Sequence, residues 1–346
     1  MIERLPRPAA ALLAVLILVL CAWCLTTRPP PIKLAPKGGY TDVMLYKDIT
    51  KAVAAGKPYH QAAAELHRAH YYPLKPFFTM RLPTLTVMAA KLGWGGLQNI
   101  AYGLVGIGIF LWVLALPEPF SAAERAGAGF AVAVGGSMVT NIGLLALHEY
   151  WAGILIGLAL ALQVGWRRHW WLALIPAAAA LAVRELALPF VLLSLAFALC
   201  ERRWREAACW AGLVAAFALL MVWQAQHVLL QVRPGDLHSQ GWNAMQGLSG
   251  FLKAVVFTSV LQPLPLGLAL LGALLPMIGW GALSGRAGAF AGLMFSGYAV
   301  MIATFSRADT FYWGGIMLPA YFVGFALLPR ALWQLAIGII QPDGRR

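Results

Sequence analysis

The chain has 346 residues, of which 61% are hydrophobic and 11% are charged, whereas a soluble domain carries about 25% charged residues. This composition excludes an ordinary soluble protein and predicts an integral membrane protein. The formal net charge of +13 would favour nucleic acid as a partner of a soluble chain. Here many basic residues fall in short loops between apolar stretches, so membrane topology explains them and no nucleic acid is expected.

Apolar stretches recur along the whole chain and predict an all-α, polytopic bundle of about ten transmembrane helices, which we treat as one domain (1–346). Backbone groups inside lipid must be satisfied within the segment, which helices achieve. The stretches lie at about 9–27, 94–116, 126–140, 142–164, 170–183, 186–200, 207–229, 263–280, 287–305 and 313–328, with an apolar tail at 331–340.

The first apolar segment follows Glu3, Arg4 and Arg7 and could be taken for a secretory signal. No small-x-small cleavage pattern precedes Arg28, so the segment predicts a signal anchor with its N-terminus inside. The short loops that then fall on the inner side are rich in arginine, as the positive-inside rule requires. Their basic residues are Arg125, Arg167, Arg168, Arg202, Arg203, Arg205, Arg286, Arg330, Arg345 and Arg346, and the short outer loops hold Arg184, Arg233 and Arg307.

Residues 170–200 allow two interpretations. They could form one 30-residue helix with Arg184 and Glu185 at its middle, or two short helices joined by the turn RELALP. The single helix would place the basic cluster at 201–206 outside. The charge rule therefore favours a tight hairpin whose turn dips below the outer surface.

The segment 28–93 is predicted to be an outer loop with juxtamembrane helices, inserted between the first and second spans. It opens with the proline-stiffened stretch RPPPIKLAP, and two helices follow at about 41–55 and 60–70. The stretch YYPLKPFFTMRLPTLTVMAAKLG mixes aromatic, basic and apolar residues, which is typical of a helix at the bilayer interface. A second outer loop, at 231–250, is polar and rich in glycine.

With this topology, the ionisable residues that are not inner-loop charges collect on the outer side. Ionisable groups at membrane depth are costly and usually functional, so this convergence is the main functional signal. The residues are Asp42, Asp48, Arg81, His148, Glu149, Arg184, Glu185, Asp236, His238, Arg307 and Asp309.

Two aspartates lie in the first predicted helix of the outer loop. Helical spacing places Asp42 on one stripe with Tyr46 and Ile49, whereas Asp48 lies on another face. We therefore expect Asp42 to lie on the apolar face of the helix and Asp48 to be a solvated charge. The plain alternative is that Asp42, just after Thr41, only complements the helix N-terminus.

His148 and Glu149 lie about six residues inside a predicted span, where they either face a cavity or sit at the membrane interface. Three arginines on separate outer elements, Arg81, Arg184 and Arg307, could converge on one anionic group. Guanidinium suits a phosphate or diphosphate through bidentate hydrogen bonds. Each arginine alone could instead contact a lipid headgroup or a neighbouring acidic residue.

Known nucleotide-binding and hydrolase signatures do not occur in the sequence. It contains no P-loop, no Rossmann glycine pattern, no G-x-S-x-G and no HExxH. The four cysteines show no paired spacing in a loop. We therefore expect neither a metal site nor a cofactor.

The layout resembles the GT-C superfamily of polytopic glycosyltransferases that use polyprenyl-phosphate sugars. The matching motifs are GGYTD around Asp42, YYPLKPFFTMRLP around Arg81 and FYWGGIMLP near the end of the chain. The resemblance implies that Asp42 is the catalytic general base on an acceptor hydroxyl. It also implies that arginines hold the departing lipid phosphate, and that the sugar is inverted in one displacement.

By the same resemblance, the substrate-binding candidates are Arg81, Arg184 and Arg307, with Glu185 beside them, and His148 and Glu149 would line the acceptor or sugar pocket. The implied partners are a polyprenyl-phosphate-linked donor, a lipid or glycan acceptor and membrane lipids. The implied location is a bacterial inner membrane, with the site facing the periplasm or exterior. A single aspartate at position 42, rather than an acidic pair, argues against a metal-dependent diphosphate donor. The alternatives are a lipid or small-solute carrier and a non-catalytic assembly subunit.

Overall fold

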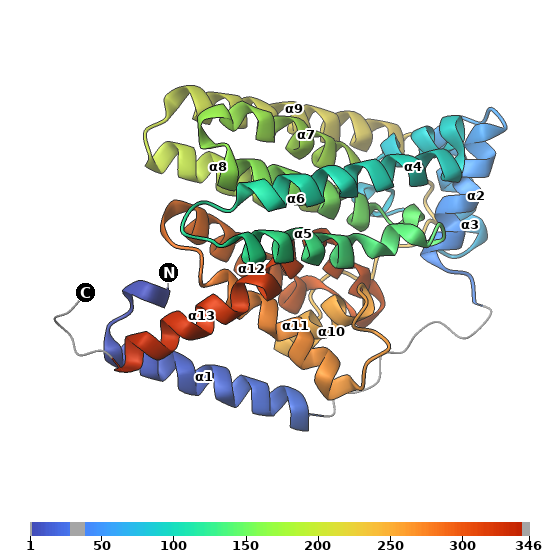
Figure 1. Cartoon of the computed structure of the whole chain (residues 1–346). Helices are drawn as coiled ribbons and strands as arrows, with labels where there is room; N and C mark the ends of the chain where they lie inside the picture. Colours follow the sequence, from blue (N-terminus) through green and yellow to red (C-terminus); the bar gives the residue numbers. More distant parts are fainter. Residues whose placement is uncertain (1, 28–38, 341–346) are drawn as a thin grey trace.

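The computed structural model describes residues 2–27 and 39–340, and every regular element within these ranges is a helix (Figure 1). This confirms the predicted all-α fold class. The helices are α1 (Arg7–Thr26), α2 (Asp42–Ala54), α3 (Tyr59–Ala69), α4 (Thr84–Ala115), α5 (Ala122–Gly136), α6 (His148–Gly165), α7 (Leu174–Val183), α8 (Leu188–Cys200), α9 (Trp204–Leu229), α10 (Gly247–Phe257), α11 (Leu266–Trp280), α12 (Gly285–Phe305) and α13 (Val323–Ile340).

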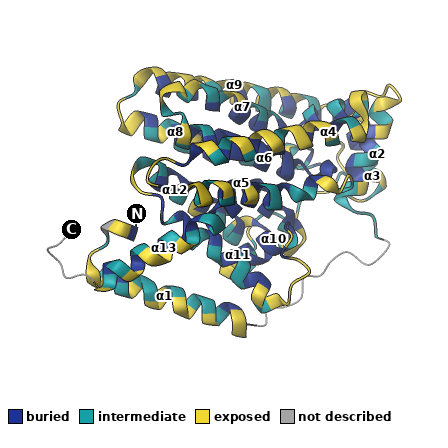
Figure 2. Ribbon diagram, viewed as in Figure 1, coloured by how far each residue is buried: buried dark blue, intermediate teal, exposed yellow. Residues whose placement is uncertain are grey.

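Five helical segments of the described chain are long and apolar enough to cross a membrane. They are Arg7–Thr26, Phe77–Ala115, Trp204–Leu229, Gly285–Phe305 and Ala320–Ile340. Their outward faces carry large exposed apolar side chains, such as Leu12, Leu18 and Leu219. Figure 2 shows exposed residues along α1 and α9. An exposed apolar surface of this extent marks contact with lipid or a partner rather than water. The chain therefore has the helices of an integral membrane protein.

Helix α6 forms the centre of the bundle. Every residue from 145 to 161 is buried, because this helix is apolar all round and can be covered on every side. It packs against α4, α7 and the 3-10 segment η7 (Ala308–Met317). The start of α6, at His148, is consequently enclosed by protein.

Residues 170–200 form the predicted hairpin and not a single helix. Arg184 has extended backbone angles of φ −150° and ψ 123°, which break the helix between α7 and α8. Arg167 precedes α7 and Glu201 follows α8, yet their side chains pair at 2.8 Å. One continuous helix would separate these two residues by about 50 Å, at 1.5 Å per residue. The two short helices therefore start and end at the same rim of the bundle.

The same rim gathers basic loops that lie far apart in the sequence. Besides its contact with Glu201, Arg167 pairs with Glu206 at 2.7 Å, and Arg286 pairs with Glu201 at 2.5 Å. Arg203 adds a contact to Glu206 at 3.1 Å. Loops that were predicted to share the inner side thus lie together, at the end of the bundle opposite Arg184.

The helices of the first outer loop agree with the prediction, but the end of that loop does not. Helices α2 and α3 match the expected ranges, and the Thr41 hydroxyl accepts the Met44 amide at the start of α2. Helix α4 begins at Thr84 and only kinks at Gly93, where φ is +70°. The loop predicted to reach residue 93 therefore ends at Pro83. The predicted proline-stiffened stretch at 28–36 lies outside the described residues.

One predicted span near the C-terminus is wrong, and one helix was not predicted. The apolar stretch 313–328 is not one span, because its first part forms η7 and the short turn η8 (Ala320–Phe322). Its last residues instead begin α13, which continues into the predicted apolar tail. The glycine pair in FYWGGIMLP and Pro319 disfavour a continuous α-helix there. Residues 247–257, which carried no prediction of a helix, form the short helix α10 against η7, and its residues 251–256 are buried.

Close backbone packing at Gly153 holds η7 against α6. A Cβ atom at Gly153 would overlap the carbonyl oxygens of Gly315 and Leu318. We expect Gly153→Ala to destabilise the protein by about 1–3 kcal/mol, because a well-packed interface cannot absorb the extra methyl group. The measurement is unfolding of the purified protein in detergent micelles.

Gly106→Ala is the matched control for this change. Gly106 lies inside α4 with nothing within 4 Å of its Cβ position. Alanine there is expected to stabilise the helix by about 0.5–1 kcal/mol. Equal stability of the two variants would contradict the close packing of α6 and η7.

Candidate functional site

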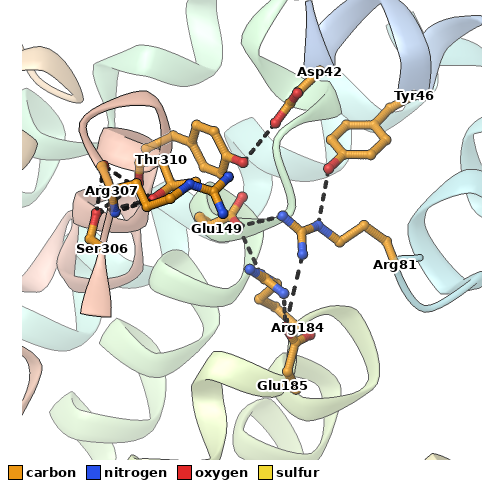
Figure 3. Close-up of polar contacts among 10 residues, drawn as sticks. Asp42, Tyr46, Arg81, Glu149, Arg184, Glu185, Ser306, Arg307 and Thr310 are labelled. Atoms are coloured by element: carbon orange, nitrogen blue, oxygen red, sulfur yellow. Dashed lines mark hydrogen bonds and ion pairs between the residues drawn. The ribbon is translucent and has the colours of Figure 1, made fainter. Parts of the chain in front are cut away.

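A buried ionic cluster lies at the start of α6 (Figure 3), at the end of the bundle opposite the rim where the basic loops gather. Its centre is Glu149, in the first turn of α6, whose side chain is fully buried. The Glu149 Oε1 atom accepts a hydrogen bond from Arg184 Nε at 2.7 Å and lies 3.7 Å from Arg81 Nη2. Arg184 also contacts Glu185, which lies 4.0 Å from Arg81 Nη1. The N-terminus of a helix and two guanidinium groups thus compensate a buried carboxylate.

Arg81 is more exposed than Arg184 and has donors left to offer. Its Nε donates to the Tyr46 hydroxyl at 3.0 Å, but its terminal nitrogens lie 3.7 and 4.0 Å from the two carboxylates. A charge-assisted hydrogen bond measures about 2.7–2.9 Å. An anion that enters the cluster can therefore be bound by Arg81 without first breaking a short ion pair.

Asp42 enters the same site from the first turn of α2. Its Oδ2 accepts a hydrogen bond of 2.6 Å from the Tyr312 hydroxyl, which η7 supplies. Burial and the charge of Asp42 raise the pKa of Tyr312 well above its usual value, and they also raise the pKa of Tyr72. These phenols therefore stay protonated at physiological pH and can donate to the carboxylate.

Tyr46 connects Asp42 to the arginines. It lies one helical turn after Asp42 on α2, as the apolar stripe predicted, and its hydroxyl contacts Arg81. Burial raises the pKa of Tyr46 to about 12. The ring of His148 packs edge-on against Tyr46, with ring centroids 5.0 Å apart. His148 thus belongs to the site through packing.

Arg307 lies at the border of the cluster and does not pair with Glu149. Its guanidinium bonds Asp309 at 3.0 and 3.1 Å and donates to the Gly241 carbonyl at 2.9 Å. The hydrogen bond with Asp309 raises the pKa of Arg307, and the charge of Asp42 adds to this effect. The structure therefore brings Arg81 and Arg184 onto one carboxylate and leaves Arg307 with its own acidic neighbour.

Other outer-side acidic residues lie in separate contacts. Asp48 pairs with Lys51 at 2.7 Å and accepts the Tyr40 hydroxyl at 3.0 Å, so it is a partly exposed surface charge as expected. Asp236 binds Arg68 at 2.7 Å, and this hydrogen bond lowers the pKa of Asp236 to about 2. Neither aspartate contributes to the cluster around Glu149.

Sequence reasoning missed Tyr312 and Tyr72 as partners of Asp42. Tyr312 lies in FYWGGIMLP, a stretch that the sequence marked only as a weak motif. The contact between Tyr312 and Asp42 joins residues 270 positions apart. Only the tertiary packing that brings α2 and η7 together creates it.

No protein-family model, no curated protein and no solved structure matches this chain. Its function therefore has to be inferred from the geometry of the site. Within residues 2–27 and 39–340, no group of three or more His, Cys, Asp or Glu side chains is arranged to hold a metal ion.

Helix α3 contains a buried histidine that should make the segment of α2 and α3 sensitive to acid. Burial lowers the pKa of His67 from 6.5 to about 4, although its Nδ1 lies 3.0 Å from the Pro73 carbonyl oxygen. The unfolded segment therefore binds the proton first as the pH falls. Its stability is complete above about pH 6.5 and decreases by about 3 kcal/mol between there and pH 4.

The test is hydrogen exchange of α2 and α3 across this pH range. His67→Gln removes the titrating group, so we expect the variant to lose most of the pH dependence between pH 6.5 and 4. An unchanged slope in the variant would assign the acid sensitivity to other groups.

Proposed function

We propose that the protein is a membrane glycosyltransferase that transfers a sugar from a polyprenyl-phosphate donor to an acceptor on the outer face of the membrane. The observation that carries the proposal is that Asp42 and Arg81 belong to one cluster at one end of the bundle, where their charges attract each other and the terminal nitrogens of Arg81 form no short ion pair. A carboxylate beside a loosely paired guanidinium fits a reaction that removes a proton from one substrate and releases a phosphate from the other.

In the proposed reaction, the acceptor hydroxyl oxygen attacks the anomeric carbon of the sugar. The bond between that carbon and the phosphate oxygen breaks, and the leaving phosphate retains the bonding electron pair. Asp42 takes the hydroxyl proton, and Arg81 binds the negative charge that develops on the phosphate. One displacement of this kind inverts the anomeric centre.

The topology of the chain is compatible with this chemistry at an outer surface. We infer that the shorter apolar helices complete a multi-pass bundle together with the five long segments, and that the cluster faces the exterior of a bacterial inner membrane. The support is the collection of basic loops at the opposite rim. The polyprenyl chain would lie between helices while its phosphate reaches Arg81.

The test is turnover of radiolabelled polyprenyl-phosphate sugars by the purified, reconstituted protein. We expect release of polyprenyl phosphate together with transfer of label to a lipid or glycan acceptor. Label that crosses the membrane without release of polyprenyl phosphate would overturn the proposal in favour of transport.

A carrier of lipid or small solute is the second candidate function. It is favoured by the interrupted helices around the buried ions, because the chain breaks at Arg184 and runs as a 3-10 segment through η7. Discontinuous helices beside buried charges are typical of transporter sites. A non-catalytic subunit would instead tolerate substitution of Asp42, whether sugar transfer or transport is measured.

A further inference from the structure

A buried glutamine in a membrane-length helix makes its polar contacts to the loop that carries Arg81. Gln224 lies in α9, a candidate span, and only 1% of its surface is exposed. Its Nε2 donates to the Arg81 carbonyl at 3.1 Å and to the Met80 carbonyl at 3.3 Å. A buried amide in an apolar helix is costly unless it is paired, and these carbonyls pair it.

A second donor reaches the same carbonyl from a different element. The Tyr59 hydroxyl, at the start of α3, donates to the Arg81 carbonyl oxygen at 2.6 Å. His60, the next residue on α3, lies with its Nε2 atom 2.9 Å from the Gln224 Oε1 atom. Both donors are thus held by elements that lie outside the loop between η2 (Phe77–Thr79) and α4.

Arg81 is consequently fixed at its two ends. Tyr59 and Gln224 hold its carbonyl, while Tyr46 and Glu149 contact its guanidinium. The main chain alone cannot set this geometry, because Arg81 lies in a short irregular segment between two helical elements. A shift of its backbone would move the terminal nitrogens relative to Asp42 and Glu149.

We propose that Tyr59 and Gln224 are positioning residues that aim Arg81 at the anionic group of the substrate. The proposal rests on the proposed function for the identity of that group, a lipid phosphate. Neither residue touches the reacting atoms. Their effect on binding should therefore pass entirely through the Arg81 side chain.

The experiment measures binding of undecaprenyl phosphate to the full-length protein in detergent micelles by native mass spectrometry. Gln224→Leu is expected to weaken binding about tenfold, because it removes one of the two donors that hold the Arg81 carbonyl and also the hydrogen bond to the Met80 carbonyl. Tyr59→Phe removes one hydroxyl and keeps the ring. This variant is also expected to weaken binding. In an Arg81→Ala background, neither substitution should weaken binding further.

Gln163→Leu is the matched control. Gln163 is another buried glutamine, on α6, whose side-chain amide contacts no hydrogen-bond partner in the described chain. We expect it to leave binding within twofold of wild type. An equal loss from Gln224→Leu with and without Arg81, or no loss at all, would overturn the positioning role.

Hydrogen exchange separates this inference from the proposed function. Gln224→Leu should speed exchange of the amides in residues 77–83, and Gln163→Leu should not. If the wild-type protein fails to bind undecaprenyl phosphate, the lipid-phosphate assignment falls and the exchange data still decide the positioning role. Unchanged exchange in Gln224→Leu would refute it.

Discussion

Asp42→Asn is expected to abolish sugar transfer while the protein remains folded. General-base catalysis contributes about 10²–10⁴-fold to a rate, and an amide cannot accept the acceptor's proton. The amide oxygen can still accept the Tyr312 hydroxyl, and the Thr41 hydroxyl still accepts an amide at the start of α2. The measurement is the turnover number with saturating polyprenyl-phosphate sugar, together with the yield and thermal stability of the variant.

Asp48→Asn is the matched control, because it makes the same chemical change six residues later on the same helix. Asp48 contacts Lys51 and Tyr40 at the surface, away from the cluster. We expect its turnover to stay close to that of the wild type. Full turnover of Asp42→Asn would remove Asp42 as the base, and equal losses in both variants would indicate a general defect of α2.

Glu149→Gln is expected to cause the largest loss of stability among single substitutions in the site. The change keeps the shape of the side chain but leaves the buried Arg184, 1% exposed, with less compensating charge. Removal of one partner from a buried ion pair typically costs about 3–5 kcal/mol. The measurement is denaturant-driven unfolding in micelles, with the midpoint and slope compared with those of the wild type.

Glu65→Gln provides the control for this loss. Its pair with Lys57 at 2.8 Å is exposed, and exposed pairs contribute about 0–1 kcal/mol. Addition of Arg184→Met to Glu149→Gln should restore part of the stability, because it removes the charge left without a partner. Additive losses in the double variant would show that Glu149 and Arg184 do not stabilise each other.

The sequence was sufficient for the parts of the structure that depend on local patterns. Composition and apolar stretches predicted an all-α membrane protein, and the two helices predicted at about 41–55 and 60–70 correspond to α2 and α3. The loop arginines favoured the hairpin at 170–200, which the contact of Arg167 with Glu201 confirms. Each of these features follows from hydropathy, charge or helix propensity over a few neighbouring residues.

Apolar composition was less informative about where helices break. Residues 313–328 are apolar enough for a span, yet η7 interrupts them, because the glycine pair and Pro319 disfavour a continuous α-helix. The interrupted chain packs closely against Gly153 of α6. Helix α10 was missed because it is short. Its 11 residues are too few to cross a hydrocarbon core of about 30 Å, so hydropathy does not distinguish it from a loop.

The amino-acid sequence by itself determined that the costly polar residues would gather at one end of a helical bundle, because burial in lipid penalises them elsewhere. Only the tertiary structure decided the pairings: Arg81 and Arg184 share Glu149, Arg307 stays with Asp309, and Tyr312 meets Asp42. Such pairings depend on distances of a few ångströms between segments up to 270 residues apart. Packing of whole helices sets those distances, and no local pattern in the chain encodes them.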